Sequence, residues 1–291
     1  MFCQTSQKLP AVGLLVVASL ATLAQADCPR DKLLAAADAY VAAQGSGQLA
    51  DLQKLFAASN FTYQENNRPH DIKTGVLTQA LKVDYHRSTA DTVACASYTE
   101  LIATTPKAYV IGTQIRHNAD MSVSMVDTIA ATAPALFFNA SLTLEYVQKE
   151  SWAPLEEGKR PSRELLQRAI DGYLDLWSSA KAFDTIPWGE PCERIEGSRY
   201  VSPCTEGTPR TGGMTANSMR RYVIDEVMGS ASVLCSFTSV GDIPDVHEIR
   251  IENGKTRYVH TITLCAVGPG GNWPTQCPKV PPARRMRLIQ A

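Results

Sequence analysis

Two of the five histidines in this chain, His247 and His260, lie in one stretch between Arg220 and Cys265. Alternating apolar and polar residues, closing on Asn253-Gly254, are typical of strands joined by tight turns. A histidine in an apolar pocket could act as a general base, or could donate a hydrogen bond to a bound carbonyl. Both histidines could instead be structural, bonded to the backbone or to a neighbouring carboxylate, and the sequence leaves both interpretations open.

Alternation along the hairpin assigns its side chains to opposite faces of a sheet. One face of the first strand carries His247, Ile249 and Ile251, its other face carries Glu248, Arg250 and Glu252, and the partner strand groups Tyr258, His260 and Ile262. We expect the histidine-bearing faces to point toward a pocket or a core and the charged faces to point toward solvent.

A second candidate segment is the stretch 184–197, which reads DTIPWGEPCERIEG. Its prolines, glycines and cysteine predict a rigid loop that holds Arg194 and Glu196 over a pocket mouth, with Trp188 as an apolar wall. An arginine–glutamate pair that only fixes the loop would explain the same residues.

The counterpart in the first half of the chain is Tyr63-Gln64-Glu65-Asn66. Tyr63 could donate a hydrogen bond to an oxyanion and Glu65 could act as a base. A surface strand explains these residues equally well.

No motif in the chain predicts a metal or a cofactor. There is no CxxC pair, HExxH, GxSxG or P-loop, and no GxGxxG precedes a helix, so zinc, hydrolase and nucleotide sites are not expected. The formal net charge of −1 provides no basic surface for nucleic acid.

The first 26 residues are typical of a secretory signal peptide. Lys8 precedes the apolar run 11–24, which ends in Ala24-Gln25-Ala26. The run is too short for a spanning helix, which needs about 20 residues, and no later segment is apolar enough to cross a membrane. We therefore expect a secreted chain that begins at Asp27, with N-glycosylation at Asn60 and Asn139 because both lie in sequons.

Seven cysteines follow the signal peptide, and in an oxidising compartment they favour disulfides. Cys235 lies within an apolar strand pattern and is the expected free thiol. The other six could form three bridges, and the first choice is Cys192 with Cys204, because the loop between them carries glycine and proline.

A helix followed by strands occurs twice in the chain. The helical pattern 30–44 matches the pattern that begins at Ser162, because Asp38, Tyr40 and Val41 align with Asp171, Tyr173 and Leu174 at a constant offset. Tyr109-Val110-Ile111 also matches Tyr222-Val223-Ile224. We infer an internal duplication and divide the chain into a signal peptide (1–26), a first domain (27–152), a linker (153–161), a second domain (162–265) and a proline-rich basic tail (266–291).

Between the two helices the pattern predicts further elements. A shorter helix is expected over 49–58, a helical turn over 78–83, and strands over 61–67, 92–104, 107–117, 121–132 and 137–152. Helices first and strands afterwards give an α+β fold class.

The helix AAADAY and the closing strands HEIRIENGKTRYVHTITL resemble the nuclear-transport-factor-like superfamily, which includes ketosteroid isomerase, scytalone dehydratase and the SnoaL cyclases. This resemblance implies two tandem cone-shaped domains, each with N-terminal helices packed on a curved, mainly antiparallel sheet. The segments CPRDKLLAAADAYVAAQ, YVIGTQIRH, PWGEPCERIEG and RRYVIDE more closely resemble a family of secreted fungal proteins of unknown function, over nearly all of the mature chain.

The resemblance implies acid–base chemistry in an apolar pocket. We expect a cofactor-independent isomerase, dehydratase or cyclase that acts on a small apolar metabolite in fungal specialised metabolism, with His260, His247, Glu196, Arg194 and Tyr63 as candidate catalytic residues. The alternative is a non-catalytic protein that binds a small ligand or serves as a secreted structural or effector protein. In single-domain members a second subunit covers the outer sheet face, so we expect a monomer with an internal pseudo-dimer and no membrane partner after signal cleavage.

Overall fold

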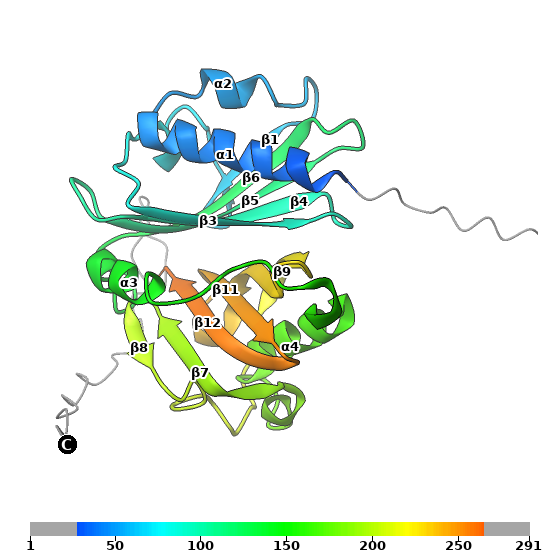
Figure 1. The fold of residues 1–291 in the computed structure, drawn as a ribbon. Coiled ribbons are helices and arrows are strands. Elements are labelled where there is room, and N and C mark those ends of the chain that lie inside the picture. Colours follow the sequence, from blue (N-terminus) through cyan, green and yellow to red (C-terminus); the bar gives the residue numbers. More distant parts are fainter. Residues whose placement is uncertain (1–27, 265–291) are drawn as a thin grey trace, which may run out of the picture.

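The computed structural model describes residues 28–264, which form two sheets with helices beside each (Figure 1). The first domain contains α1 (Arg30–Ser46), α2 (Ala50–Gln53), β1 (Thr62–Glu65), β2 (Arg68–Pro69), the 3-10 turn η1 (Val76–Thr78), β3 (Tyr85–Asp91), β4 (Ala96–Ala103), β5 (Tyr109–His117) and β6 (Val123–Ala131). It is followed by α3 (Ala140–Val147) and η2 (Glu157–Lys159). The second domain contains α4 (Arg163–Asp175), η3 (Ala182–Thr185), β7 (Trp188–Glu196), β8 (Arg199–Val201), β9 (Ser218–Asp225), β10 (Ser230–Phe237), η4 (Thr238–Val240), β11 (Ile243–Glu252) and β12 (Lys255–Thr263).

The two sheets have the same topology. Each has six strands, in the orders β2-β1-β6-β5-β4-β3 and β8-β7-β12-β11-β10-β9. The pairs β1–β6 and β7–β12 are parallel and the other pairs are antiparallel. Helix α1 packs on β3 and β4, and α4 packs on β9, β10 and β11. The predicted α+β class with two similar domains is therefore confirmed.

Strand order also corrects one detail of the predicted repeat. Strand β9 occupies the edge position that β3 occupies in the first sheet, so Tyr222–Ile224 is not the counterpart of Tyr109–Ile111. The match between those tripeptides was fortuitous, because both are apolar strand segments.

Helix α1 begins at Arg30, as the sequence predicts, and extends two residues beyond the predicted end. Alanine dominates it, and its buried face includes Leu33, Ala37 and Tyr40. Gly47 ends the helix in the left-handed conformation, with φ of 68°, and its N–H donates to the carbonyl of Ala43 at 2.7 Å. A Cβ at Gly47 would lie 2.9 Å from backbone atoms of Thr78 and Ala80, so glycine is required there for two reasons.

Three predicted elements differ from the structure. The segment 137–152 contains helix α3 rather than a strand, because Asn139 caps it by accepting a hydrogen bond from the Leu142 N–H at 3.2 Å. The segment 188–196 is strand β7 rather than a loop. The expected helical turn 78–83 is absent, because the 3-10 turn η1 ends at Thr78 and the following residues lead into β3.

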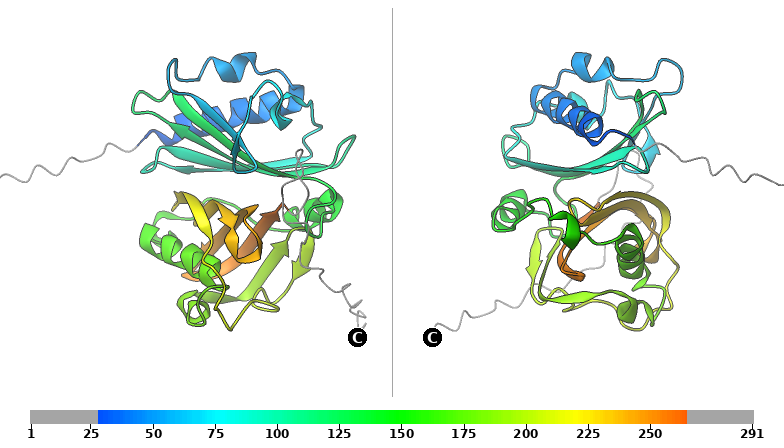
Figure 2. Two further views of the ribbon diagram at one scale, coloured as in Figure 1. Left: turned by 180° about the vertical axis from the view of Figure 1, so that it is seen from behind. Right: turned by 45° about the vertical axis from the view of Figure 1, so that its right-hand side comes forward.

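The outer faces of the two sheets pack against each other (Figures 1 and 2). One apolar cluster joins Tyr98, Val110 and Ile129 of the first sheet to Leu234 and Val246 of the second. The helices α1 and α4 lie on the opposite faces, each with its own core. Each domain therefore covers the sheet face that the other would expose.

Ion pairs cross this interface reciprocally. Arg30 at the start of α1 donates two hydrogen bonds to Asp225 of the second domain, at 2.8 and 2.7 Å. Arg163 at the start of α4 donates two to Asp91 of the first domain, at 2.7 and 2.8 Å. Each aspartate also accepts a backbone N–H from the opposite edge strand, that of Ala90 or of Ile224, at 2.8 Å. Such a reciprocal pattern is that of a two-fold interface between equivalent surfaces.

Two disulfides are present in the described residues. Cys28 is bonded to Cys95, and Cys192 is bonded to Cys204 as predicted. Cys235 is a buried free thiol. The predicted signal peptide, the basic tail, and the two cysteines Cys265 and Cys277 lie outside the described residues.

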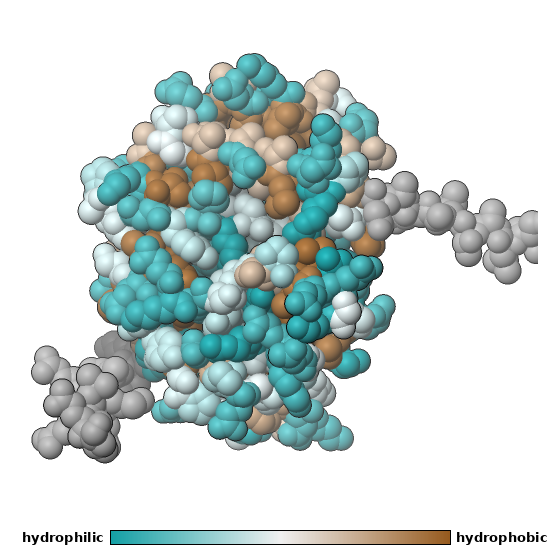
Figure 3. All heavy atoms as spheres, in the orientation of Figure 1, coloured by the Kyte–Doolittle hydropathy of each residue, from teal (hydrophilic) through white to brown (hydrophobic). Residues whose placement is uncertain are grey.

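Hydrophilic residues cover much of the face shown in Figure 3. Among the described residues, no helix is both long and apolar enough to span a bilayer.

The interface predicts a large and equal loss of stability when either aspartate is removed. Asp91→Ala or Asp225→Ala would leave a guanidinium without its carboxylate and a backbone N–H without an acceptor, so we expect each to lower the free energy of unfolding by about 3–5 kcal/mol. Urea denaturation measures this loss. The matched control is Asp51→Ala, which breaks an exposed pair with Lys54 and should have no measurable effect. If all three variants lowered the free energy of unfolding equally, the assignment of Asp91 and Asp225 as interface anchors would be contradicted.

Candidate functional site

The structure places the five candidate residues in three separate regions. Tyr63 lies in the interior of the first domain, and His260 lies at the interface between the domains. His247 and Arg194 lie in the interior of the second domain, with Glu196 at its edge. A single site containing all five is therefore excluded.

His260 is held between two carboxylates. Its Nδ1 lies 3.0 Å from Glu100 Oε2 of the first domain, and its Nε2 lies 2.8 Å from Glu150 Oε2. Burial alone would lower the pKa of this imidazole, but the two carboxylates outweigh burial and raise it well above the usual value. His260 is thus a buried imidazolium that links the domains, and both of its ring nitrogens are already bonded.

The charged face of the hairpin is buried, which contradicts the expectation that it faces solvent. Glu248 and Arg250 are 1% and 2% exposed. Arg87 of β3 donates to both Glu248 oxygens, at 2.8 and 2.7 Å, and to Glu100 at 2.8 Å. The prediction was wrong because this face meets the other sheet, and charged partners there replace water.

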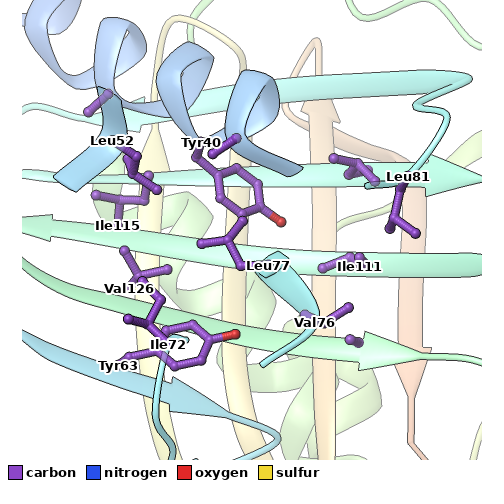
Figure 4. Close-up of a cluster of buried hydrophobic side chains, with 14 of the residues drawn as sticks. Tyr40, Leu52, Tyr63, Ile72, Val76, Leu77, Leu81, Ile111, Ile115 and Val126 are labelled. Carbon is purple, nitrogen blue, oxygen red and sulfur yellow. The ribbon is translucent and has the colours of Figure 1, made fainter. Parts of the chain in front are cut away.

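The interior of the first domain is a filled core (Figure 4). Ile72 and Val126 lie beside Tyr63, and the same cluster contains Tyr40 and Leu77. The Tyr63 hydroxyl donates to Glu65 Oε2 at 2.9 Å, and burial together with the charge of Glu65 raises the pKa of this phenol. The Glu65 carboxylate also accepts the Val76 N–H at 2.8 Å, so both side chains have structural partners.

The interior of the second domain contains a buried polar group that the first lacks. Asp245 and His247 are two residues apart on β11 and therefore share a face, and Cys235 lies beside Asp245 on β10. Asp245 Oδ2 is 3.3 Å from His247 Nε2, and Thr263 donates to Asp245 Oδ1 at 2.8 Å. All three residues are 0–1% exposed.

Aromatic rings surround His247. The rings of Tyr173, Phe237 and Trp177 have centroids 5.2, 5.7 and 6.2 Å from the imidazole centroid. Burial among them, followed by the charges of Arg194 and Arg220, lowers the pKa of His247 to about 3. Burial likewise raises the pKa of Asp245 well above its usual value. Burial therefore favours the neutral form of both side chains.

Arg194 reaches the same interior from β7. Its Nη2 donates to the carbonyl of Glu206 at 2.6 Å, and its Nη1 lies 3.4 Å from the Tyr173 hydroxyl. Glu196 Oε2 is 3.6 Å from Arg194 but 2.6 Å from Arg199, so this carboxylate is shared.

Strand β7 was missed because Gly189 and Pro191 lie within it. They fall where its pairing with β12 is irregular, in the gap between the pair Trp188–Thr256 and the pair Glu193–Tyr258. Proline is tolerated at such a bulge because its missing N–H is not needed by the ladder.

Several polar atoms in this interior have no hydrogen-bond partner among the described residues. They include Asp245 Oδ2, His247 Nδ1 and Arg194 Nε. Buried polar groups are nearly always bonded, and an unbonded one costs about 1–3 kcal/mol, so this group is a candidate binding site.

The register of the two sheets shows what the first domain has at the same positions. His247 pairs with Thr261 and Val233, as Thr113 pairs with Thr128 and Thr99. By the same pairing, Leu101 is the counterpart of Cys235, and Ile111 is the counterpart of Asp245. Thr113 is the counterpart of His247, and Tyr63 is the counterpart of Arg194. One copy of the fold is therefore built without these buried thiol, carboxyl, imidazole and guanidinium groups.

Sequence reasoning missed Asp245, Tyr173 and the place of Cys235 in this group. Asp245 could have been found, because alternation places it on the His247 face. Its position opposite Cys235 depends on a strand register that no turn motif in the sequence specifies.

Two groups of side chains have the chemical types of metal ligands. Cys235, Asp245 and His247 each offer a ligand atom within 4.8 Å of the others, and so do Glu100, Glu248 and His260. In the first group burial raises the pKa of both the thiol and the carboxyl, so a metal would have to displace two protons. In the second group Arg87 already neutralises the carboxylates.

Comparison with known proteins bears on the second domain. Residues 159–263 match a family described as a domain of unknown function (DUF8021). The matched residues extend from just before α4 to the end of β12, so the similarity covers the domain with the polar interior. No curated protein matches the chain.

Acid titration should reveal the neutral state of His247. Between about pH 6.5 and about pH 3 the unfolded chain binds a proton at this residue and the folded chain does not, so wild type loses up to about 1.4 kcal/mol of stability per pH unit. His247→Gln should not show this loss, and the difference in unfolding free energy between the two should narrow or invert as pH falls. His86→Gln, on the surface, is the control. Parallel pH profiles for wild type and His247→Gln would refute the assignment.

His260 should behave in the opposite way. His260→Gln leaves two buried carboxylates facing each other, and we expect a loss of about 3–5 kcal/mol in unfolding free energy. The folded pKa lies above the unfolded value of 6.5, so the stabilisation by His260 is full below that pH and is lost as pH rises through the folded pKa. Urea denaturation of both proteins across neutral and alkaline pH measures it. A difference that grows with rising pH would be inconsistent with an imidazolium.

Proposed function

We propose that this protein is a secreted pocket protein of the nuclear-transport-factor-like type, in which the second of two cone-shaped domains binds a small, largely apolar metabolite and activates it by acid–base chemistry. The observation that supports this proposal is the difference between the two interiors. Burying Asp245, His247 and Arg194 opposes folding, and the first domain adopts the same topology with Ile111, Thr113 and Tyr63 in their place. Groups that the fold does not need, with shifted pKa values, are typical of functional sites.

The chemistry follows from the neutral Asp245–His247 pair. Asp245 Oδ2 lies 3.3 Å from His247 Nε2 but has no hydrogen-bond partner among the described residues, and a small rotation of the protonated carboxyl would let it donate to Nε2. The other ring nitrogen then carries the imidazole proton and presents an N–H donor to the interior. Such a donor in apolar surroundings stabilises the negative charge that develops on a carbonyl oxygen when a neighbouring carbon loses a proton. Isomerisation, dehydration and ring closure next to a carbonyl all use this step.

The alternative is a non-catalytic protein that binds the metabolite without converting it. The observation in its favour is that His260, Tyr63 and Glu65, three other residues considered for catalysis, all have structural partners. The Asp245–His247 pair would then serve recognition alone, by a hydrogen bond to a bound carbonyl.

The cellular setting is part of the proposal. Two disulfides and the exposed sequon asparagines Asn60 and Asn139 support a secreted, glycosylated protein. Mutual coverage of the two sheets supports a monomer with an internal pseudo-dimer. The resemblance to secreted fungal proteins supports a place in fungal specialised metabolism.

Metabolite profiling of the producing organism tests the proposal. We expect at least one secreted small molecule to change about tenfold or more when the protein is removed, and the same change when Asp245→Asn or His247→Gln replaces wild type. The matched control is Thr113→Val, at the position equivalent to His247, which should retain the wild-type profile if the variant is folded. A molecule that is retained by the protein but not converted would favour the binding alternative. An unchanged profile without the protein, or an equal effect of the control, would refute the second-domain site.

A further inference from the structure

Arg194 differs from other buried arginines of the described residues in its partners. The other two buried arginines in this part of the chain, Arg87 and Arg250, each donate to a carboxylate, at 2.8 and 2.6 Å, although Arg250 also bonds the neutral carbonyl of Ala153. Arg194 is only 2% exposed, yet its short contact at 2.6 Å is to a neutral carbonyl. Its nearest carboxylate, Glu196, is 3.6 Å away and bonds Arg199 more closely.

The fold does not account for this buried cation. The equivalent residue in the first domain is Tyr63, which is neutral and fully packed. A buried charge whose nearest carboxylate is 3.6 Å away and shared with Arg199 is incompletely neutralised, and such an arginine is well suited to an anion. Arg194 Nε, which has no partner among the described residues, is a donor that such an anion could use.

The surroundings of Arg194 indicate what else the anion would carry. The Tyr173 hydroxyl lies 3.4 Å from Arg194, and the ring of the same tyrosine packs 5.2 Å from His247. The ring of Trp188 also packs against Tyr173, with centroids 6.3 Å apart. A molecule reaching from Arg194 toward His247 would therefore lie against aromatic rings.

We propose that the ligand of the second domain is an organic anion, an apolar ring compound with a carboxylate that pairs with Arg194. This inference rests on the proposed function, because it specifies the ligand of the same interior. The carboxylate would complete the guanidinium fork, and a carbonyl elsewhere on the ring system would meet the His247 N–H. Tyr173 separates the two donors and so sets the spacing between carboxylate and carbonyl.

A thin layer of chain covers Arg194. The carbonyl that it bonds belongs to Glu206, which lies two residues after the disulfide-bonded Cys204. The next residue, Gly207, is exposed and has φ of 71°, and a Cβ there would lie 3.9 Å from the guanidinium. This segment therefore lies between the guanidinium and solvent, and its displacement would open a route for a ligand.

Two probes of equal shape and different charge test the inference. Naphthoate carries a ring system with a carboxylate, and naphthylmethanol is its neutral counterpart. We expect naphthoate to bind the intact secreted protein about tenfold or more tightly in equilibrium dialysis at neutral pH, because a charged hydrogen-bonded pair contributes about 1.5–3 kcal/mol. Arg194→Gln should remove this preference, and Arg194→Lys should retain part of it.

The control separates this site from surface charge. Arg168→Gln removes an exposed arginine on α4 and should leave the preference unchanged. Thermal unfolding verifies that each variant is folded. If Arg194→Gln does not fold, Arg194→Lys still tests the inference. Equal binding of both probes, or a preference that survives in Arg194→Gln, would overturn the anion assignment while leaving the pocket in place. Binding of neither probe would count against both the anion assignment and the proposed pocket.

Discussion

The structure depends on the mutual burial of two sheet faces. Each domain alone would expose an apolar face that includes Tyr98 and Val110 on one side or Leu234 and Val246 on the other. Apolar contact stabilises this interface but does not specify the orientation of the two domains. The reciprocal bonds from Arg30 to Asp225 and from Arg163 to Asp91 specify it, because each requires its partner domain in one orientation. Their aspartates also bond edge-strand N–H groups of the opposite domain, which fixes the two edges together.

This interface explains why histidine alone was a poor guide to function. His247 and His260 lie on adjacent strands, but one faces a helix-covered interior and the other faces the opposite sheet. The first has a lowered pKa because aromatic rings exclude water, and the second has a raised pKa because two carboxylates hold its proton. The same residue type is therefore a candidate functional group in one place and a structural cation in the other.

The sequence was sufficient for features that are encoded locally. Helix α1 follows from its alanines and the glycine at 47, and the repeat follows from the spacing of Tyr40 and Tyr173. Features that depend on which residues pack against a given sheet face could not be predicted from the sequence. Alternation groups Glu248 with Arg250 but does not reveal that Arg87, far away in the chain, lies opposite. Helix α3 was missed because its capping residue, Asn139, was interpreted only as a glycosylation site.

Joining the two domains in one chain has a consequence for how such an interior can arise. In a dimer of identical subunits, every substitution enters both copies, so a costly buried group such as Asp245 would destabilise the assembly twice. Here the covalent connection keeps the partner at a high effective concentration and lets the two copies diverge. The first domain can keep an apolar interior with Ile111 and supply stability, while the second carries Asp245 and His247. The two copies can thus take different roles, and in the proposed function the first is the scaffold and the second carries the site.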